Sequence, residues 1–285
     1  MLRDIPAGSP SALIAAVSDD LTPTERRIAE AVLDDPTLLA FGTVAELARQ
    51  VGTSRPSVVR FAVKLGFEGY TELQESVQKR LSRRLFRPSD RIRHDGDPTT
   101  TAARAALTDA IAAVFDAIAG DKLAALGDPI AEAEAVWVVS GETSRAGASA
   151  LVSGLSIVRP HVTFVEGHSV GTDLAGAGTE DVAVVFDFYR YRQHAVDAAR
   201  AFADMSVRII SITDGPLSPL ARLTDTWLDL SVPAIGPFDS SVPAVAAAEL
   251  LVAHVATKLH HEATERIDRT EAMWDATRTF LADPG

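Results

Sequence analysis

The stretch that decides the fold of the N-terminal part covers residues 43–66 and reads TVAELARQVGTSRPSVVRFAVKLG. Thr43, followed three residues later by Glu46, forms a capping box, which marks the start of a helix. Gly52 then permits a left-handed turn and a close crossing of two helices. The apolar residues of the first helix recur at helical spacing, at Val44, Leu47, Ala48 and Val51. The pattern predicts a short helix that ends in a tight turn.

A second helix is predicted directly after this turn. Ser54 can cap its start, and Pro56 falls in its first turn, where a missing N–H costs little. Gly66 is a typical helix stop. One face of this helix is apolar, with Val58, Phe61, Ala62 and Leu65. The two helices together predict a helix-turn-helix.

The opposite face of the second helix is polar and basic. A DNA major groove accepts such a narrow convex surface, and arginine can pair with a guanine edge. An ordinary helical hairpin with a basic outside is the alternative. Because the caps, the spacing and the polar face agree, we favour DNA binding. The predicted DNA-binding residues are Ser54, Arg55, Ser57, Arg60 and Lys64.

The charge of the chain is unevenly distributed. The net charge is −12, yet residues 1–95 carry a net +1, and the rest of the chain carries −13. An acidic body would repel DNA and confine contact to the N-terminal part. A basic run in residues 79–93 is either a secondary contact with the DNA backbone or a solvated helix face or linker. It contains Lys79, Arg80, Arg83, Arg84, Arg87, Arg91 and Arg93.

Composition narrows the class and the compartment. With 47% hydrophobic residues in 285, the chain can form a packed core. The absence of cysteine excludes disulfides and cysteine-based zinc sites. No secretory signal is seen, and the most apolar stretch, residues 243–255, is short and carries Glu249 and His254. We expect a cytoplasmic protein without membrane contact, cofactor or metal.

After a polar, turn-rich segment the pattern changes. Strand-like apolar runs at 135–139, 162–165, 182–186, 208–212 and 227–230 alternate with helical stretches. This predicts a five-stranded parallel, doubly wound sheet, in which ligands bind beyond the carboxyl ends of the strands. Long helices are expected at 99–119, 240–260 and 262–281. The domains are therefore an all-α helix-turn-helix domain at 1–86, a linker at 87–98 and an α/β domain at 99–285.

Loops after the predicted strands offer ligand-binding groups. Hydroxyls and backbone N–H groups at a helix start suit an anion, and arginine suits phosphate or carboxylate. Turns of this composition also occur without a ligand, the arginines could instead pair with acids or face a partner subunit, and Ser240 could cap the helix after it. The predicted ligand-binding residues are Gly141, Thr143, Ser144, Arg145, Asp187, Tyr189, Arg190, Arg192 and Ser240.

The N-terminal motifs resemble those of RpiR-type regulators. Residues 54–61 match the pattern Ser-x-x-Thr-Val-x-Arg-Phe, with Ser57 in place of threonine, and residues 64–67 read Lys-Leu-Gly-Phe. The resemblance implies an N-terminal DNA-binding domain joined to a sugar isomerase (SIS) domain that senses phosphorylated sugars or related metabolites. Sugar-phosphate-binding SIS domains carry a Ser-x-Ser-Gly-x-Thr phosphate cradle after the third strand. This chain has Asp187 and the following Phe-Tyr-Arg-Tyr-Arg there, similar to a family branch with Asp-Phe-Arg-Arg-Tyr.

We therefore predict a ligand-responsive bacterial transcription regulator that controls carbohydrate or related genes. Its partners would be an operator DNA duplex, a small phosphorylated or acidic metabolite and a second copy of the chain, as a homodimer or a dimer of dimers. The segments 99–119 and 242–256 are candidates for the oligomer surface. One alternative is an α/β domain that only dimerises. Another is a phosphosugar isomerase, but Glu142, Glu166 and Asp187 form no recognisable catalytic motif, so we expect no enzyme.

Overall fold

The computed structural model of the chain describes residues 14, 17, 20–34, 38–39, 42–75, 77, 89, 91–92, 99–215 and 218–281. The chain forms two compact units, one built from residues 1–96 and the other beginning at residue 97. Most of the predicted linker lies outside the described residues. Each unit is described by itself below.

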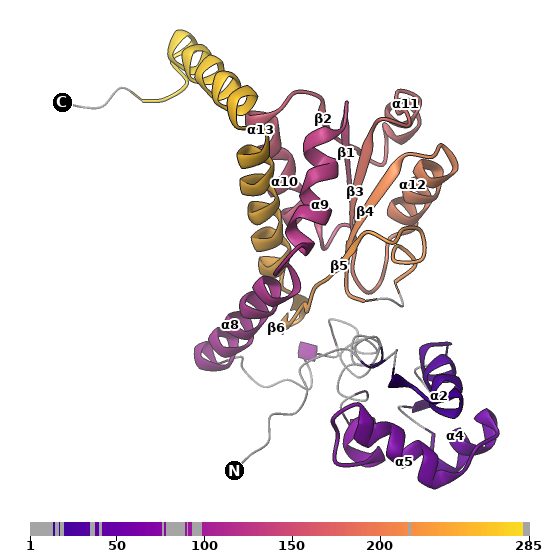
Figure 1. Cartoon of the computed structure of the whole chain (residues 1–285). Coiled ribbons are helices and arrows are strands. Elements are labelled where there is room, and N and C mark those ends of the chain that lie inside the picture. The colour runs from indigo at the N-terminus through magenta and orange to yellow at the C-terminus, as the bar shows by residue number, and fades with distance from the viewer. Residues whose placement is uncertain are drawn as a thin grey trace. The chain divides into compact units, whose positions relative to one another are not determined.

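The N-terminal unit is helical. Helices α2 (Pro23–Asp34), α4 (Val44–Val51) and α5 (Arg55–Lys64) pack around one apolar core (Figure 1). The helix-turn-helix prediction is confirmed by α4 and α5. The largest fully buried side chains of this core are Ile28, Leu39, Leu47, Phe61 and Leu73.

Local capping explains where these helices begin and end. The backbone N–H of Thr43 donates to Glu46 Oε2 at 2.7 Å, and the Glu46 N–H donates to Thr43 Oγ1 at 3.2 Å, which completes the predicted capping box. Gly52 ends α4 with φ +67°, a left-handed conformation that glycine adopts without strain. Ser54 caps α5 by accepting the Ser57 N–H at 3.4 Å. The turn is therefore encoded by residues within it.

The second unit contains the predicted five-stranded sheet. Its strands are β1 (Val136–Ser140), β2 (Val162–Phe164), β3 (Val182–Phe186), β4 (Arg208–Thr213) and β5 (Trp227–Asp229). The order is β2-β1-β3-β4-β5, and all neighbouring strands are parallel. In register, Val138 lies between Phe164 of β2 and Val184 of β3. The predicted fold class is confirmed.

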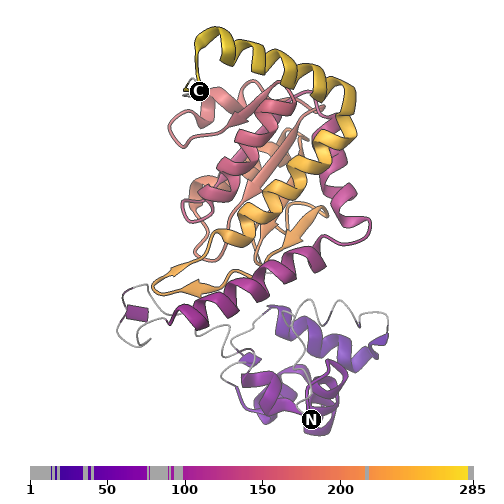
Figure 2. The same cartoon turned by 90° about the vertical axis from the view of Figure 1, so that its left-hand side faces the viewer.

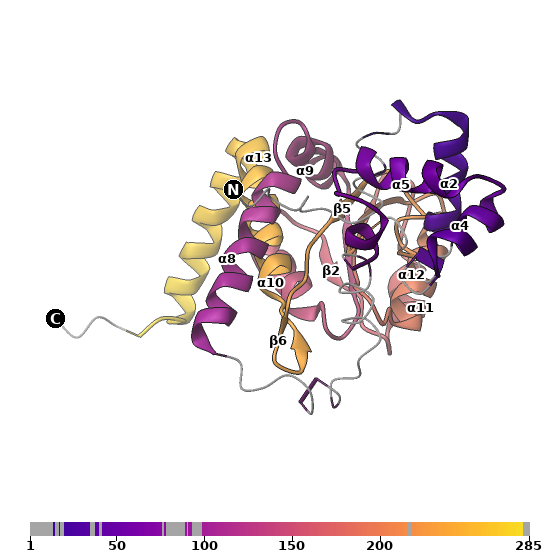
Figure 3. The same ribbon diagram turned by 90° about the horizontal axis from the view of Figure 1, so that it is seen from below.

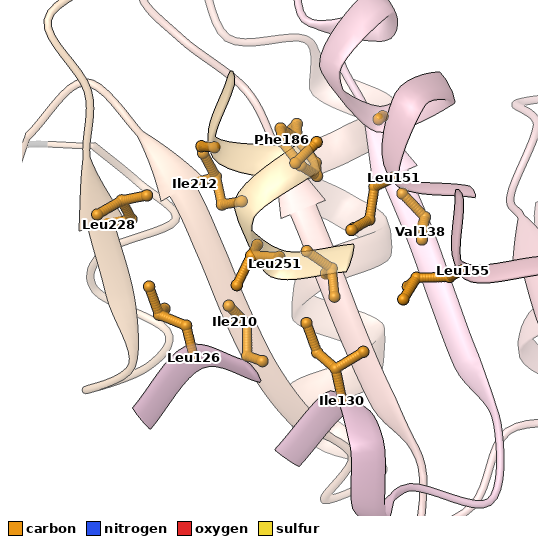
Figure 4. Close-up of a cluster of buried hydrophobic side chains, with 14 of the residues drawn as sticks. Leu126, Ile130, Val138, Leu151, Leu155, Phe186, Ile210, Ile212, Leu228 and Leu251 are labelled. Carbon is orange, nitrogen blue, oxygen red and sulfur yellow. The ribbon is translucent and has the colours of Figure 1, made fainter. Parts of the chain in front are cut away.

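Helices cover both faces of the sheet (Figure 1). Helices α9 (Lys122–Glu132), α10 (Arg145–Val158) and α13 (Val242–Thr277) lie on one face, and α11 (Val170–Leu174) and α12 (Gln193–Asp204) on the other. Figure 4 shows the larger core, where side chains of β1, β3, β4 and β5 meet those of the covering helices. Burial on both faces explains why the strands are almost continuously apolar.

Helices α10 and α13 cross at very short range (Figure 2). A Cβ atom added at Gly147 would lie 2.6 Å from the Ala244 Cβ, and one at Gly154 would lie 2.7 Å from a methyl group of Val252. Neither position has room for a side chain. The crossing therefore depends on glycine in α10.

Replacing Gly147 with valine is expected to lower the free energy of unfolding of this unit by about 1–3 kcal/mol or more, because the new side chain would overpack a close crossing. Urea unfolding followed by tryptophan fluorescence measures this unit alone, since all three tryptophans, Trp137, Trp227 and Trp274, lie in it. Gly171→Val is the matched control, because nothing lies within 4 Å of a Cβ there. Equal stability of the two variants would contradict the close crossing.

Helix α13 joins the two helices expected at 240–260 and 262–281 across a kink at His260. By length and composition alone it is apolar enough to cross a membrane, a test that the core helix of a soluble protein also passes. Part of its apolar surface is buried within its own domain, so the residues concerned are not available to the predicted oligomer surface at 242–256. The buried residues are Pro243, Ala244, Ala247, Ala248, Leu251, Val255 and Ala263.

Two further elements complete the unit. Helix α8 (Thr100–Ala117) contacts α13 and leaves Phe115 54% exposed (Figure 3). Strands β6 (Ala234–Ile235) and β7 (Phe238–Asp239) form a small antiparallel hairpin. This hairpin was not predicted, because its strands are only two residues long and carry no alternating pattern.

Candidate DNA-binding surface and effector site

The buried face of α5 fixes the direction of its polar face. Val58, Phe61 and Ala62 are buried, so Arg60 points away from the core and is exposed. Its guanidinium donates to the Ser57 hydroxyl at 3.2 Å, and that hydroxyl lies 2.9 Å from the Ser54 hydroxyl. Ser57, which stands where the RpiR pattern has threonine, thus holds Arg60 and the cap together. Arg55 is exposed at the first turn.

Lys64 is placed differently from the other predicted DNA-binding residues. Its ammonium group forms a 3.0 Å ion pair with Glu25 of α2 and donates to the Asp20 carbonyl. Burial raises the pKa of Glu25, but hydrogen bonds from Thr22 and Lys64 outweigh this and lower it. Lys64 therefore joins α5 to α2, and the exposed cations of α5 are Arg55 and Arg60.

Two valines on α5 were missed by sequence reasoning. Val59 is 38% exposed and Val63 is 53% exposed, and they stand one turn apart beside Arg60. An apolar side chain on a DNA-facing helix can contact a thymine methyl group. The signal was present in the sequence, since both lie outside the apolar stripe of α5. Of the seven lysines and arginines of the basic run at 79–93, only Arg91 lies within the described residues.

The predicted ligand loops meet at the carboxyl ends of β1 and β3. Ser144 is fully buried, and its hydroxyl donates to the Gly141 carbonyl at 3.1 Å and to the Phe186 carbonyl at 2.7 Å. A Cβ atom added at Gly141 would lie 2.0 Å from Asp187 Oδ1. The structure therefore brings Gly141, Ser144 and Asp187 together, but it directs the Ser144 hydroxyl to the backbone.

Asp187 is fully buried at the end of β3. Its Oδ1 accepts the Phe188 N–H at 3.0 Å, and its Oδ2 accepts the Arg192 N–H at 2.6 Å. Burial raises the pKa of Asp187 to about 6, against the effect of these hydrogen bonds. The nearby Asp214 carboxylate adds to the rise, and His194 opposes it.

Asp214, directly after β4, accepts hydrogen bonds from the loop between β3 and α12. The Tyr189 N–H donates to Asp214 Oδ2 at 3.1 Å, and the Tyr191 hydroxyl donates to Asp214 Oδ1. Asp214 was not among the predicted ligand-binding residues. His194 was missed altogether, and its Nε2 lies 3.0 Å from the Ser140 carbonyl oxygen.

The arginines around this end of the sheet differ in their surroundings. Arg192 forms a 2.9 Å ion pair with Glu142, as the alternative of pairing with acids anticipated. Arg145 pairs with Glu166 and lies 4.8 Å above the Phe164 ring, and the hydrogen bond from Arg145 lowers the pKa of Glu166. Arg190 is exposed in a left-handed conformation with φ +71°.

The remaining predicted ligand residues are Thr143 and Ser240. Thr143 is exposed in the loop after β1. Ser240 accepts the Val242 N–H at 3.2 Å, but the N-cap residue of α13 is Ser241, whose side chain makes no capping hydrogen bond. Among the described residues, no three histidine, aspartate or glutamate side chains gather as metal ligands would.

A pocket lies at the opposite, amino-terminal edge of the sheet. It is lined by Glu134, His161, Thr179, Glu180 and Asp181, among others. The Asp181 carboxylate is already bonded by the N–H groups of Ala135 and Gly178 and by the Trp137 indole. This pocket is remote from the strand ends where doubly wound sheets bind ligands, so it is not part of the candidate site.

Two models of known protein families match this chain. A model of the rpiR-family helix-turn-helix domain matches residues 11–84, and a model of the SIS domain matches residues 137–254. The chain belongs to the rpiR family. It is a transcription regulator that combines a DNA-binding helix-turn-helix domain with an SIS domain.

Two relatives of this RpiR-family chain align with it over almost their whole length. An uncharacterised HTH-type transcriptional regulator from Caldanaerobacter subterraneus is 23% identical and aligns with 92% of this chain and 95% of its own. YbbH, an uncharacterised HTH-type regulator from Bacillus subtilis, is 22% identical over 94% of this chain and 97% of its own.

Solved structures share the fold. The sugar isomerase domain of an RpiR transcription factor from Sphaerobacter thermophilus has a TM-score of 0.56 at 23% identity, covering 59% of this chain and 96% of that one. Vibrio vulnificus NanR, solved in complex with ManNAc-6P, has a TM-score of 0.57 at 18% identity, covering 94% of this chain and 99% of that one.

Proposed function

We propose that this RpiR-family regulator binds operator DNA through α5, and that a small carbohydrate-derived metabolite changes its affinity for the operator. The observation that best supports the DNA contact is Arg60, exposed on a capped helix and held by the Ser57 hydroxyl. A fixed guanidinium on a convex helix is suited to the edge of a guanine in the major groove. Arg55, Val59 and Val63 extend the same surface.

The effector would bind beyond the carboxyl ends of β1 and β3. Support comes from the SIS fold, from the convergence of three loops there, and from NanR, whose structure contains ManNAc-6P. Phosphorylated and acidic sugars are therefore the first compounds to test. Binding alters DNA affinity only when the ligand prefers one arrangement of the protein over another.

We propose a homodimer or a dimer of dimers in the cytoplasm. Two-fold symmetry would present two copies of α5 to the half-sites of a pseudo-palindromic operator. Helix α8, with its exposed Phe115, and the unburied part of 242–256, with Val242 38% exposed, are the candidate oligomer surfaces. Size-exclusion chromatography with light scattering measures the assembly directly.

A second candidate function is a regulator whose SIS domain only dimerises. The observation that favours it is the engagement of the Ser144 hydroxyl and the Asp187 carboxylate by the chain's own backbone. An isomerase is less well supported, because Glu142, Glu166 and Asp187 are each held by an arginine or by backbone N–H groups. We therefore propose no enzymatic activity.

The proposed function is tested by recovering genomic fragments that the full chain binds and by measuring their binding by fluorescence anisotropy. The titration is then repeated with sugars, phosphosugars, sugar acids and polyols, each also used in a thermal-shift assay. A compound that both stabilises the protein and shifts operator affinity supports sensing. Stabilisation by none of them would favour the dimerisation-only alternative.

Arg190→Ala is expected to leave operator affinity unchanged and to abolish the response to the effector. Its guanidinium is exposed at the proposed ligand-binding end of the sheet and lies far in sequence from α5. Anisotropy with and without the effector measures both properties. Arg222→Ala, another exposed arginine of this unit, is the control and should respond as the wild type does. An unchanged response in Arg190→Ala would remove this end of the sheet as the effector site.

A further inference from the structure

The outward face of α5 carries two valines beside Arg60. Val63 is 53% exposed and Val59 is 38% exposed, whereas Val58 on the opposite side of the helix is fully buried. At about 3.6 residues per turn, Val63 lies about 60° around the helix axis from Arg60 and about 40° from Val59. The two valines and the arginine therefore form one continuous surface.

The fold of the N-terminal unit does not account for these valines. The apolar core of the unit includes Val58, Phe61 and Leu65 from this segment, and neither Val59 nor Val63 packs against it. Valine is also a weaker helix former than alanine or arginine, because its branched side chain loses rotamer freedom against the preceding turn. Neither packing nor helix formation explains two exposed valines one turn apart, which points to a partner outside the unit.

The chemistry of the surrounding side chains indicates what this partner is. The exposed Arg55 and Arg60 lie on the same helix as the valines, and the helix is the second one of a helix-turn-helix. Such a helix enters the major groove of a DNA duplex, whose phosphates attract the arginines. Protein interfaces, in contrast, are depleted of charged residues at their centres. A DNA duplex therefore fits this mixed basic and apolar surface.

Within the major groove, one base is matched to an apolar side chain. Of the four bases only thymine presents an apolar group there, its C5 methyl, whereas the other bases present hydrogen-bonding atoms. Valine is stiff about its first side-chain bond, so little rotamer freedom is lost when it packs against a methyl group. Along the axis of α5, Val59 and Val63 are separated by about 6 Å, close to two base-pair steps of about 3.4 Å.

We infer that Val59 and Val63 contact the C5 methyl groups of thymines, so that the operator half-site contains thymines within about two base pairs of the base that Arg60 meets. The valines thereby add specificity for thymine to the hydrogen bonds of the arginines. This inference rests on the proposed function, because it names a base that the proposed DNA-binding surface recognises.

The test removes the methyl group from the DNA. The half-site is first obtained by selecting random duplexes with the full chain, and each thymine is then replaced singly by deoxyuridine, which lacks only the C5 methyl. Wild type is expected to lose about fourfold in affinity at one or two thymines of the half-site, as the loss of one buried methyl group implies. Deoxyuridine outside the half-sites should leave the affinity unchanged.

Valine-to-alanine variants connect each methyl group to its partner. Val63→Ala should bind the thymine and deoxyuridine duplexes equally at one of these positions, and Val59→Ala should do so at the other. Met273→Ala is the control, since it shortens another exposed apolar side chain, 61% exposed, in the second unit. It should keep the wild-type preference for thymine. Both valine variants replace an exposed residue with a better helix former, and circular dichroism checks that they are folded.

Three results would overturn the inference. They are a selected half-site without thymine, equal binding of thymine and deoxyuridine duplexes by wild type at every position, and an unchanged preference for thymine in either valine variant. If that unchanged preference is accompanied by a smaller assembly in light scattering, the valines contact a second copy of the chain instead. The proposed function fails separately, when the full chain selects no sequence at all, and the inference then falls with it. A selected sequence without dependence on thymine methyl groups contradicts the inference alone.

Discussion

Replacing Arg60 with alanine is expected to weaken operator binding by about 1–3 kcal/mol, a loss of roughly 5- to 150-fold in affinity. Arg60 is exposed on α5, and the Ser57 hydroxyl holds its guanidinium at 3.2 Å, so little side-chain entropy is lost when it meets a base. Anisotropy of a labelled operator at fixed salt measures the change. The salt concentration must be the same throughout, because contacts with phosphates depend on it.

Arg27→Ala provides the control for this measurement. Arg27 is also exposed in the N-terminal unit, but it lies on α2 rather than α5. Its replacement should change operator affinity by less than about 0.5 kcal/mol, as expected of a surface substitution away from a binding site. Wild-type affinity in Arg60→Ala, or an equal loss in both variants, would remove Arg60 from the recognition surface.

Raising the pH is expected to cost the SIS domain about 3 kcal/mol of stability through Asp187 alone. The pKa of this buried carboxyl is raised from 3.8 to about 6 in the folded state. Between these two values the folded state holds the proton more tightly than the unfolded state does. The stabilisation is therefore complete below pH 3.8 and is lost as the pH rises through about 6.

Urea unfolding of wild type and Asp187→Asn, followed by tryptophan fluorescence, measures this contribution. Between about pH 5 and about pH 7.5, wild type should lose roughly 1.4 kcal/mol relative to the variant, which has no proton to exchange at this position. The comparison with Glu166→Gln should show the opposite trend: wild type should gain stability relative to this variant as the pH rises. Arg145 lowers the pKa of Glu166, so that carboxylate stabilises the fold above its ordinary pKa and loses this effect as the pH falls. A constant difference between wild type and Asp187→Asn would show that Asp187 does not titrate in this range.

The helix-turn-helix could be predicted closely because its determinants are local. The reciprocal hydrogen bonds of Thr43 and Glu46, the left-handed Gly52 and the Ser54 cap all connect residues within four positions of one another. The apolar stripe of α5 likewise follows from helical periodicity alone. The five parallel strands were predictable for a similar reason, since each is a short apolar run between polar turns.

The roles of the site residues could not be predicted as well from the sequence. Lys64 has the same sequence context as Arg60, yet it pairs with Glu25, which lies 39 positions earlier. Ser144 reads as a hydroxyl for a ligand, but the Phe186 carbonyl, 42 positions away, takes its hydrogen bond. Asp214 acts on the 187–192 loop from the end of a different strand. Such partners are set by how strands align in the sheet, which no local pattern specifies.

The sequence by itself therefore determined which segments become helices and strands, the helix-turn-helix and the faces that its helices bury, because capping and periodicity act over a few residues. Only the tertiary structure decided which exposed cations remain on α5 and that Asp187 and Asp214 accept the backbone N–H groups of the loop after β3. The physical reason is that hydrogen-bonding groups bind whichever partner the packed core brings within about 3 Å. That partner lies far away in the chain.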